Sequence, residues 1–66
     1  MANEFLLVID NGDTEEVYGP RPTLSKAKEL FQETVRGRNI FDAQILEFDE
    51  DGSIVRTHVP ERDRRR

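Results

Sequence analysis

The chain has 66 residues, no cysteine and a single histidine, which excludes disulfide bonds and zinc sites built from thiolates. The net charge is −4, but residues 1–55 carry 12 acidic and 5 basic side chains, whereas residues 56–66 carry 5 arginines and 2 acidic side chains. An acidic body argues against a broad nucleic-acid-binding face on the folded part.

A chain of this length forms one domain, whose core supplies only ~3–5 kcal/mol of stability. Natural chains this short often add disulfides, a metal or a second subunit. The longest apolar run is too short for a signal peptide or a membrane span. We therefore expect one small domain over residues 1–60, a flexible arginine-rich tail over residues 61–66, and a cytoplasmic location.

Residues 4–10 predict the first strand, and five consecutive apolar side chains stand at residues 5–9. Because side chains alternate across a strand, this strand is apolar on both faces. One face holds Phe5, Leu7 and Ile9, and the other holds Leu6 and Val8. A single helix covers only one face of a sheet, so either set needs further cover, and a second copy of the chain can supply it.

Asn11-Gly12 predicts a tight type I′ turn followed by a strand at about residues 14–18. A two-residue loop pairs Phe5 with Tyr18, but it also places Asp10 opposite Asp13. Two acidic residues facing each other are unfavourable, so a longer loop is the alternative. The segment Gly19-Pro20-Arg21-Pro22 then predicts an extended connector, because proline is excluded from strand interiors.

Thr23 stands at the predicted N-cap of a helix, and Gly37 stands where that helix ends. Between them, apolar residues recur at helical spacing and form a single stripe. The stripe consists of Leu24, Ala27, Leu30, Phe31 and Val35. After the helix, Ile40 and Phe41 are expected to pin the return loop to the core.

Two more strands are predicted over residues 43–49 and 53–59, joined by a turn at Asp51-Gly52. The expected pairs are Phe48 with Val55, Leu46 with Thr57, and Glu47 with Arg56. One face then holds Leu46, Phe48, Val55 and Val59, and the other holds Ile45, Ile54 and His58. The element order predicts an α+β fold, with a four-stranded antiparallel sheet in the order 2-1-3-4 and one helix on one face.

Catalytic chemistry has no support in the motifs of this chain. His58 has no nucleophile motif beside it, and neither Ser25 nor Ser53 lies in one, so we expect a protein that is not an enzyme and has no cofactor. The two acidic turns leave a small-ligand or metal-binding protein as an alternative. The second turn is similar to part of a calcium EF-hand loop, but His58 stands where that loop requires glutamate.

The arrangement Tyr18, Thr23-Leu24, Ala27 and Glu29-Leu30 resembles the small inhibitors of host RNA polymerase made by T7-like phages. The resemblance covers less than half of the chain, and the second hairpin departs from that family's ending. It implies that this architecture can serve as a protein-binding module on a larger enzyme. An acidic surface can do the same by imitating nucleic acid.

The function expected from the sequence is therefore non-catalytic: a small interaction or regulatory protein that binds another protein. We expect a homodimer joined through the uncovered face or an edge of the sheet. The candidate contact residues are Phe5, Leu7, Ile9, Tyr18, Ile45, Ile54, Arg56, Arg62 and Arg64. A second alternative is a nucleic-acid binder that uses the arginine-rich tail to contact phosphates.

Overall fold

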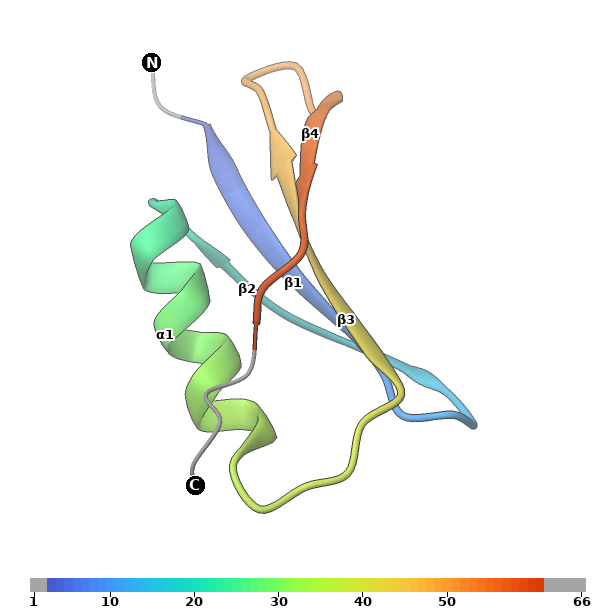
Figure 1. Cartoon of the computed structure of the whole chain (residues 1–66). Coiled ribbons are helices and arrows are strands. Elements are labelled where there is room, and N and C mark those ends of the chain that lie inside the picture. Colours follow the sequence, from blue (N-terminus) through green and yellow to red (C-terminus); the bar gives the residue numbers. More distant parts are fainter. Residues whose placement is uncertain (1–2, 62–66) are drawn as a thin grey trace.

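Four antiparallel strands and one helix make up the fold of residues 3–61, the part of the chain that the computed structural model describes. The elements are β1 (Glu4–Asp10), β2 (Glu15–Arg21), α1 (Leu24–Val35), β3 (Asp42–Phe48) and β4 (Ile54–His58). The strands form one sheet in the order β2-β1-β3-β4, with the helix against it (Figure 1). The predicted α+β class, strand order and single helix are confirmed.

Helix α1 begins and ends where the sequence predicts. The Thr23 side chain accepts a hydrogen bond from the Lys26 amide at 3.1 Å, which caps the N-terminus. At the other end, Gly37 has a φ of +70°, and the Arg38 amide donates to the Val35 carbonyl at 3.0 Å. A left-handed residue at this position favours glycine, so Gly37 ends the helix as a C-cap motif requires.

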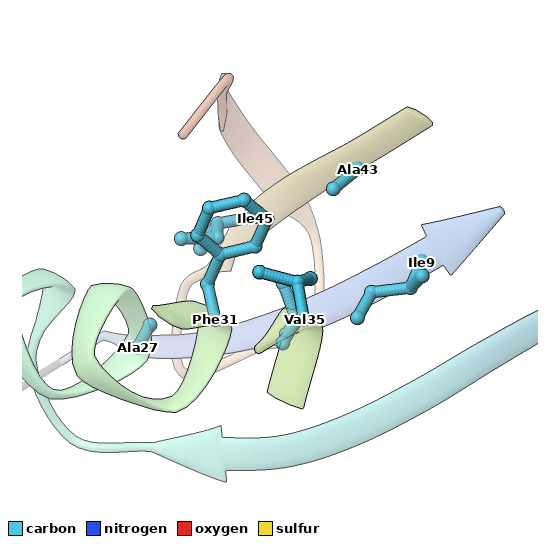
Figure 2. Packing of buried hydrophobic residues seen from close by; sticks show 7 residues of the cluster. Ile9, Ala27, Phe31, Val35, Ala43 and Ile45 are labelled. Atoms are coloured by element: carbon cyan, nitrogen blue, oxygen red, sulfur yellow. The ribbon is translucent and has the colours of Figure 1, made fainter. Parts of the chain in front are cut away.

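The core lies between α1 and the face of the sheet that carries Leu7 and Ile9 of β1 (Figure 2). Both side chains are fully buried, and α1 packs chiefly on β1 and β2. The remaining buried members of the core are Ala27, Phe31, Val35, Ala43 and Ile45. The side chains of β1 that face the helix are therefore those of the alternating set with Leu7 and Ile9.

The return loop after α1 is pinned differently from the prediction. Ile40 packs against the core, as expected. Phe41 does not, because its side chain is 78% exposed. Its backbone amide instead donates to the Asp10 carbonyl at 2.8 Å, and this hydrogen bond ties the loop to the end of β1.

The first hairpin has a four-residue loop, so the register derived from a two-residue turn is wrong and the longer alternative is right. Asp10 pairs with Glu15, and Leu7 pairs with Tyr18. The Asn11 side chain closes the loop by accepting hydrogen bonds from the amides of Asp13 and Thr14, each at 3.0 Å. Such side-chain capping by asparagine replaces the expected type I′ geometry.

Strand β2 continues through Gly19-Pro20 to Arg21, where the sequence predicts a connector. Arg21 pairs with Phe5, and an extra residue on β2 makes a bulge between Tyr18 and Arg21. Gly19 has a φ of +106°, which other residues rarely adopt. The strand tolerates Pro20 because β2 lies at an edge of the sheet, where bulges and proline are usual.

The second hairpin confirms the pairs Leu46 with Thr57 and Glu47 with Arg56. A bulge then shifts the register, so that Phe48 pairs with Ile54 instead of Val55. Cross-strand partners share a face, so Ile54 lies on the face of Phe48. The prediction that placed Ile54 with Ile45 on the other face is wrong.

Candidate protein-binding surface

One face of the sheet has no covering element among residues 3–61, because α1 packs on the opposite face (Figure 1). Directly paired residues of antiparallel strands share a face, so the strand register identifies the side chains of this uncovered face. We call it the open face. Its apolar side chains are Leu6, Val8, Val17, Leu46, Phe48 and Ile54.

The apolar side chains of the open face form a continuous surface across all four strands. The outer members are the most exposed, with Val17 at 59% and Ile54 at 55%, and the bulge residue Val55 next to Ile54 is 50% exposed. The members on the two central strands are half-buried by their neighbours in the sheet. Contiguous apolar surfaces of this kind mark interaction sites on small proteins.

Carboxylates border the open face at both ends of the sheet. Asp10 pairs with Glu15 on one side and with Asp42 on the other, which places three acidic residues in a row across β2, β1 and β3. At the opposite end, Glu4 pairs with Phe48 and so shares its face. We call these four residues the acidic rim. They give the open face a negative potential at its ends.

No lysine or arginine of the described strands lies on the open face. Arg21 pairs with Phe5, and Arg56 pairs with Glu47, so both arginines belong to the helix side of the sheet. The open face therefore combines an apolar centre with an acidic rim and has no cation among its strand residues.

The predicted contact residues separate into a buried group and a surface group. Leu7, Ile9 and Ile45 are 0% exposed beneath α1, so they belong to the core and not to the exposed surface of this fold. Phe5 and Tyr18 are half-buried against the same core.

The remaining predicted contact residues lie on different parts of the chain. Ile54 belongs to the open face, whereas Arg56 is exposed on the helix side. Arg62 and Arg64 lie outside the described residues, as does the predicted tail apart from Glu61. The Glu61 carbonyl accepts a hydrogen bond from the Gln32 side chain at 2.9 Å, which ties this residue to α1.

The sequence-based list of candidate contact residues omits the apolar residues of the open face on the central strands. A signal for them exists in β1. The alternating set that contains Leu6 and Val8 ends in Glu4 and Asp10, whereas the other set ends in uncharged Asn3 and Asn11. Charged ends favour the solvent side of a sheet, because burying an unpaired carboxylate is costly. That asymmetry between the two sets distinguishes the open face from the helix side.

Glu47 organises a polar cluster on the helix side of β3 and β4. Its carboxylate accepts a hydrogen bond from the Asn3 side chain at 2.7 Å and lies 2.9 Å from His58 Nε2. The Phe5 and His58 rings lie next to each other, with centroids 6.0 Å apart. The hydrogen bonds from Asn3 and His58, together with the positive charge of Arg56, lower the pKa of Glu47.

Glu16 organises a second polar cluster, which joins β2 to the loop after α1. Tyr18 donates its hydroxyl to this carboxylate at 2.6 Å, and Arg38 donates to both carboxylate oxygens at 3.0 and 3.1 Å. Asn11 adds a further hydrogen bond at 3.1 Å. The hydrogen bonds from Tyr18 and Arg38 lower the pKa of Glu16. This cluster fixes the return loop in place of Phe41.

These two lowered pKa values predict a loss of stability in acid. A glutamate in the unfolded chain has a pKa of about 4.3. The stabilisation from Glu16 and Glu47 is therefore fully present above that pH and is lost as the pH falls through the lower folded-state values. We expect the urea midpoint of the wild type to fall between about pH 5 and pH 2, and the double variant E16Q/E47Q to show a smaller fall. Glu29→Gln, on the exposed side of α1, is the control and should keep the wild-type dependence.

The acidic turns use their side chains to close their own loops. Asp10 accepts a hydrogen bond from the Gly12 amide at 2.9 Å, and Asp49 accepts from the amides of Asp51 and Ser53 at 2.9 and 3.0 Å. Within residues 3–61, no group of three or more metal-binding side chains is arranged to hold an ion. None of the helices in this part of the chain is long and apolar enough to cross a membrane.

No protein-family model, curated protein or solved structure matches this chain. The open face and its acidic rim are the features of residues 3–61 on which a functional proposal can rest. They combine a hydrophobic centre, which supplies binding energy, with charges that favour a partner of opposite sign.

Proposed function

We propose that this protein is a non-catalytic binding module whose open face docks an apolar segment of another protein flanked by lysine or arginine. The observation that carries this proposal is the charge pattern of the open face, which has an apolar centre, an acidic rim and no strand cation. Burial of the centre supplies the affinity, at about 25 cal/mol for each Å² of apolar surface. The rim supplies orientation and speeds association.

The same charge pattern argues against a second copy as the occupant of this face. Packing two open faces together buries two acidic rims with no cation from either face to neutralise them. Like charges brought together across an interface cost several kcal/mol, on the order of the whole stability of a domain this small. A basic partner removes this cost. The rim likewise repels phosphates, so the open face favours a protein over nucleic acid.

The partner is most simply encountered in the cytoplasm. A cysteine-free chain is compatible with a reducing compartment and gains nothing from an oxidising one. The proposal includes regulation of a larger enzyme through a basic patch, because an acidic rim around an apolar centre fits such a surface.

The proposal is tested by titrating the isotope-labelled protein with two helical peptides and following its amide NMR signals. One peptide carries leucine on one face and lysine on the other, and its matched counterpart carries glutamate in place of lysine. We expect the lysine peptide to shift signals of β1, β2 and β3 around the open face, and the glutamate peptide to shift none. Equal binding of both peptides, or shifts confined to α1, would contradict the proposal.

A charge-matched pair of variants locates the binding surface. Val8→Lys places a cation at the centre of the open face, and Ser25→Lys makes the same charge change on the exposed side of α1. Repulsion and lost apolar contact should weaken binding of the lysine peptide by roughly tenfold or more in the first variant, which corresponds to ~1.4 kcal/mol or more. The second variant should bind as the wild type does. Circular dichroism of both variants verifies that the sheet and helix remain.

A further inference from the structure

The two edge strands of the sheet differ in how they are protected from further pairing. Strand β2 carries a bulge and Pro20, which has no amide proton to donate. Strand β4 also carries a bulge, at Val55, but it contains neither proline nor lysine between Ile54 and His58. Three of its five residues are β-branched, a composition that favours pairing in a sheet.

Exposed apolar side chains also gather along β4. Ile54 is 55% exposed, Val55 is 50% exposed, and Val59, directly after the strand, is 73% exposed. Only two other large apolar side chains in residues 3–61 are exposed to a similar degree, namely Val17 and Phe41. An edge strand that lacks proline and exposes apolar side chains can serve as a template for another strand.

We propose that β4 pairs antiparallel with β4 of a second copy, so that two four-stranded sheets become one continuous sheet across a two-fold axis. A two-fold pairing of this kind is self-complementary, because each edge supplies both the donors and the acceptors that the other requires. The proposal concerns the edge of the sheet and does not depend on what the open face binds.

Charge selects the register of this pairing. An axis at Arg56 places Arg56 opposite its own copy, and like charges directly opposite each other are destabilising. An axis at Thr57 pairs Thr57 with Thr57 and Arg56 with His58, and it brings Val55, at the bulge, opposite Val59, which directly follows the strand. Threonine pairs and β-branched apolar pairs are favourable across strands. Axes nearer the loop place the bulge at Val55 closer to the centre of the pairing, and axes further along meet Pro60.

The Thr57 register also gives Arg56 a second acidic neighbour. In each copy, His58 lies 2.9 Å from the Glu47 carboxylate on the helix side of the sheet. Arg56 of one copy then stands beside the Glu47–His58 pair of the other, and the carboxylate attracts it. The two helices lie on the same side of the continuous sheet, and the two open faces lie side by side on the other.

Light scattering over a hundredfold dilution gives the first test. The wild type should show twice the chain mass of 7.7 kDa at high concentration and fall toward 7.7 kDa on dilution. A mass of 7.7 kDa at every concentration would overturn the proposal.

A charge-swap experiment identifies the interface. V55K/V59K and V55E/V59E place like charges opposite each other in the proposed register, so each variant should be monomeric alone. An equimolar mixture should form a dimer, because lysine then faces glutamate on both sides of the axis. Val17→Lys, on the other edge strand, is the control and should remain dimeric. Dimers of either charged variant alone, or a monomeric Val17→Lys protein, would overturn pairing through β4.

The experiments distinguish a failure of β4 pairing from a failure of binding by the open face. If Val17→Lys abolishes dimerisation while the charged β4 variants remain dimeric, the open face is the self-association surface, and both proposals are wrong. If all variants are monomeric and the lysine peptide still binds, only the pairing of β4 is wrong. The cysteine-free chain also permits a direct test of register, since Thr57→Cys should form a disulfide-linked dimer on oxidation and Ser25→Cys should not.

Discussion

Leu7→Ala should lower the free energy of unfolding by ~2–5 kcal/mol, whereas Leu6→Ala, one residue earlier in the same strand, should cost far less. Leu7 is 0% exposed between β1 and α1, and its truncation leaves a cavity that the helix cannot close. Leu6 lies on the open face and already contacts solvent. Since a domain of this size has only ~3–5 kcal/mol of stability, the Leu7 variant should be largely unfolded at 25 °C.

Urea unfolding followed by circular dichroism gives the free energy of unfolding of both leucine variants, and each variant is the control for the other. The chemical change is the same, and the two positions are adjacent in the central strand β1. A difference in stability therefore reports the face of the sheet and not the residue type. Equal losses, or a larger loss for Leu6→Ala, would mean that the two faces of β1 are assigned the wrong way round.

The element order and strand order could be predicted because each segment carries its own signal. The run at residues 5–9 is continuous and β-like, the stripe from Leu24 to Val35 has helical spacing, and Thr23 and Gly37 mark the helix ends. These are local properties, and the structure confirms them. Pairing of β1 with both β2 and β3 then follows from the central place of the most apolar strand.

The registers could be predicted only in part, because bulges depend on contacts that no local pattern specifies. The predicted pair Glu47 with Arg56 is correct, and the next pair is not, because Val55 is the extra residue of a bulge. In the first hairpin, the capping by the Asn11 side chain lengthens the loop. A register change of one residue moves a side chain to the other face of the sheet. An error in the predicted register therefore assigns residues to the wrong face.

The sequence could predict that one face of the sheet is apolar and uncovered, but it could not predict which residues form that face. A strand that is apolar on both faces under a single helix implies an uncovered apolar face. The identity of that face depends on which set of β1 side chains meets α1, and the predicted contact residues Leu7 and Ile9 are buried beneath the helix. The acidic rim depends on the register of Asp10 with Glu15, which requires the four-residue loop.

Phe31→Ala should be the most damaging single truncation in α1, with an expected loss of ~3–5 kcal/mol. The Phe31 side chain is 2% exposed and packs beside Ile45, and it is the largest side chain of the buried core (Figure 2). Phe41→Ala is the matched control, because its ring is 78% exposed and should contribute within about 0.5 kcal/mol. Thermal unfolding by circular dichroism compares the two variants.

A folded Phe31 variant with a wild-type midpoint would mean that α1 does not cover the sheet as described. A large loss for Phe41→Ala would mean that its ring is buried in solution, for instance against a second copy, and the return loop would then have to be counted as part of an interface.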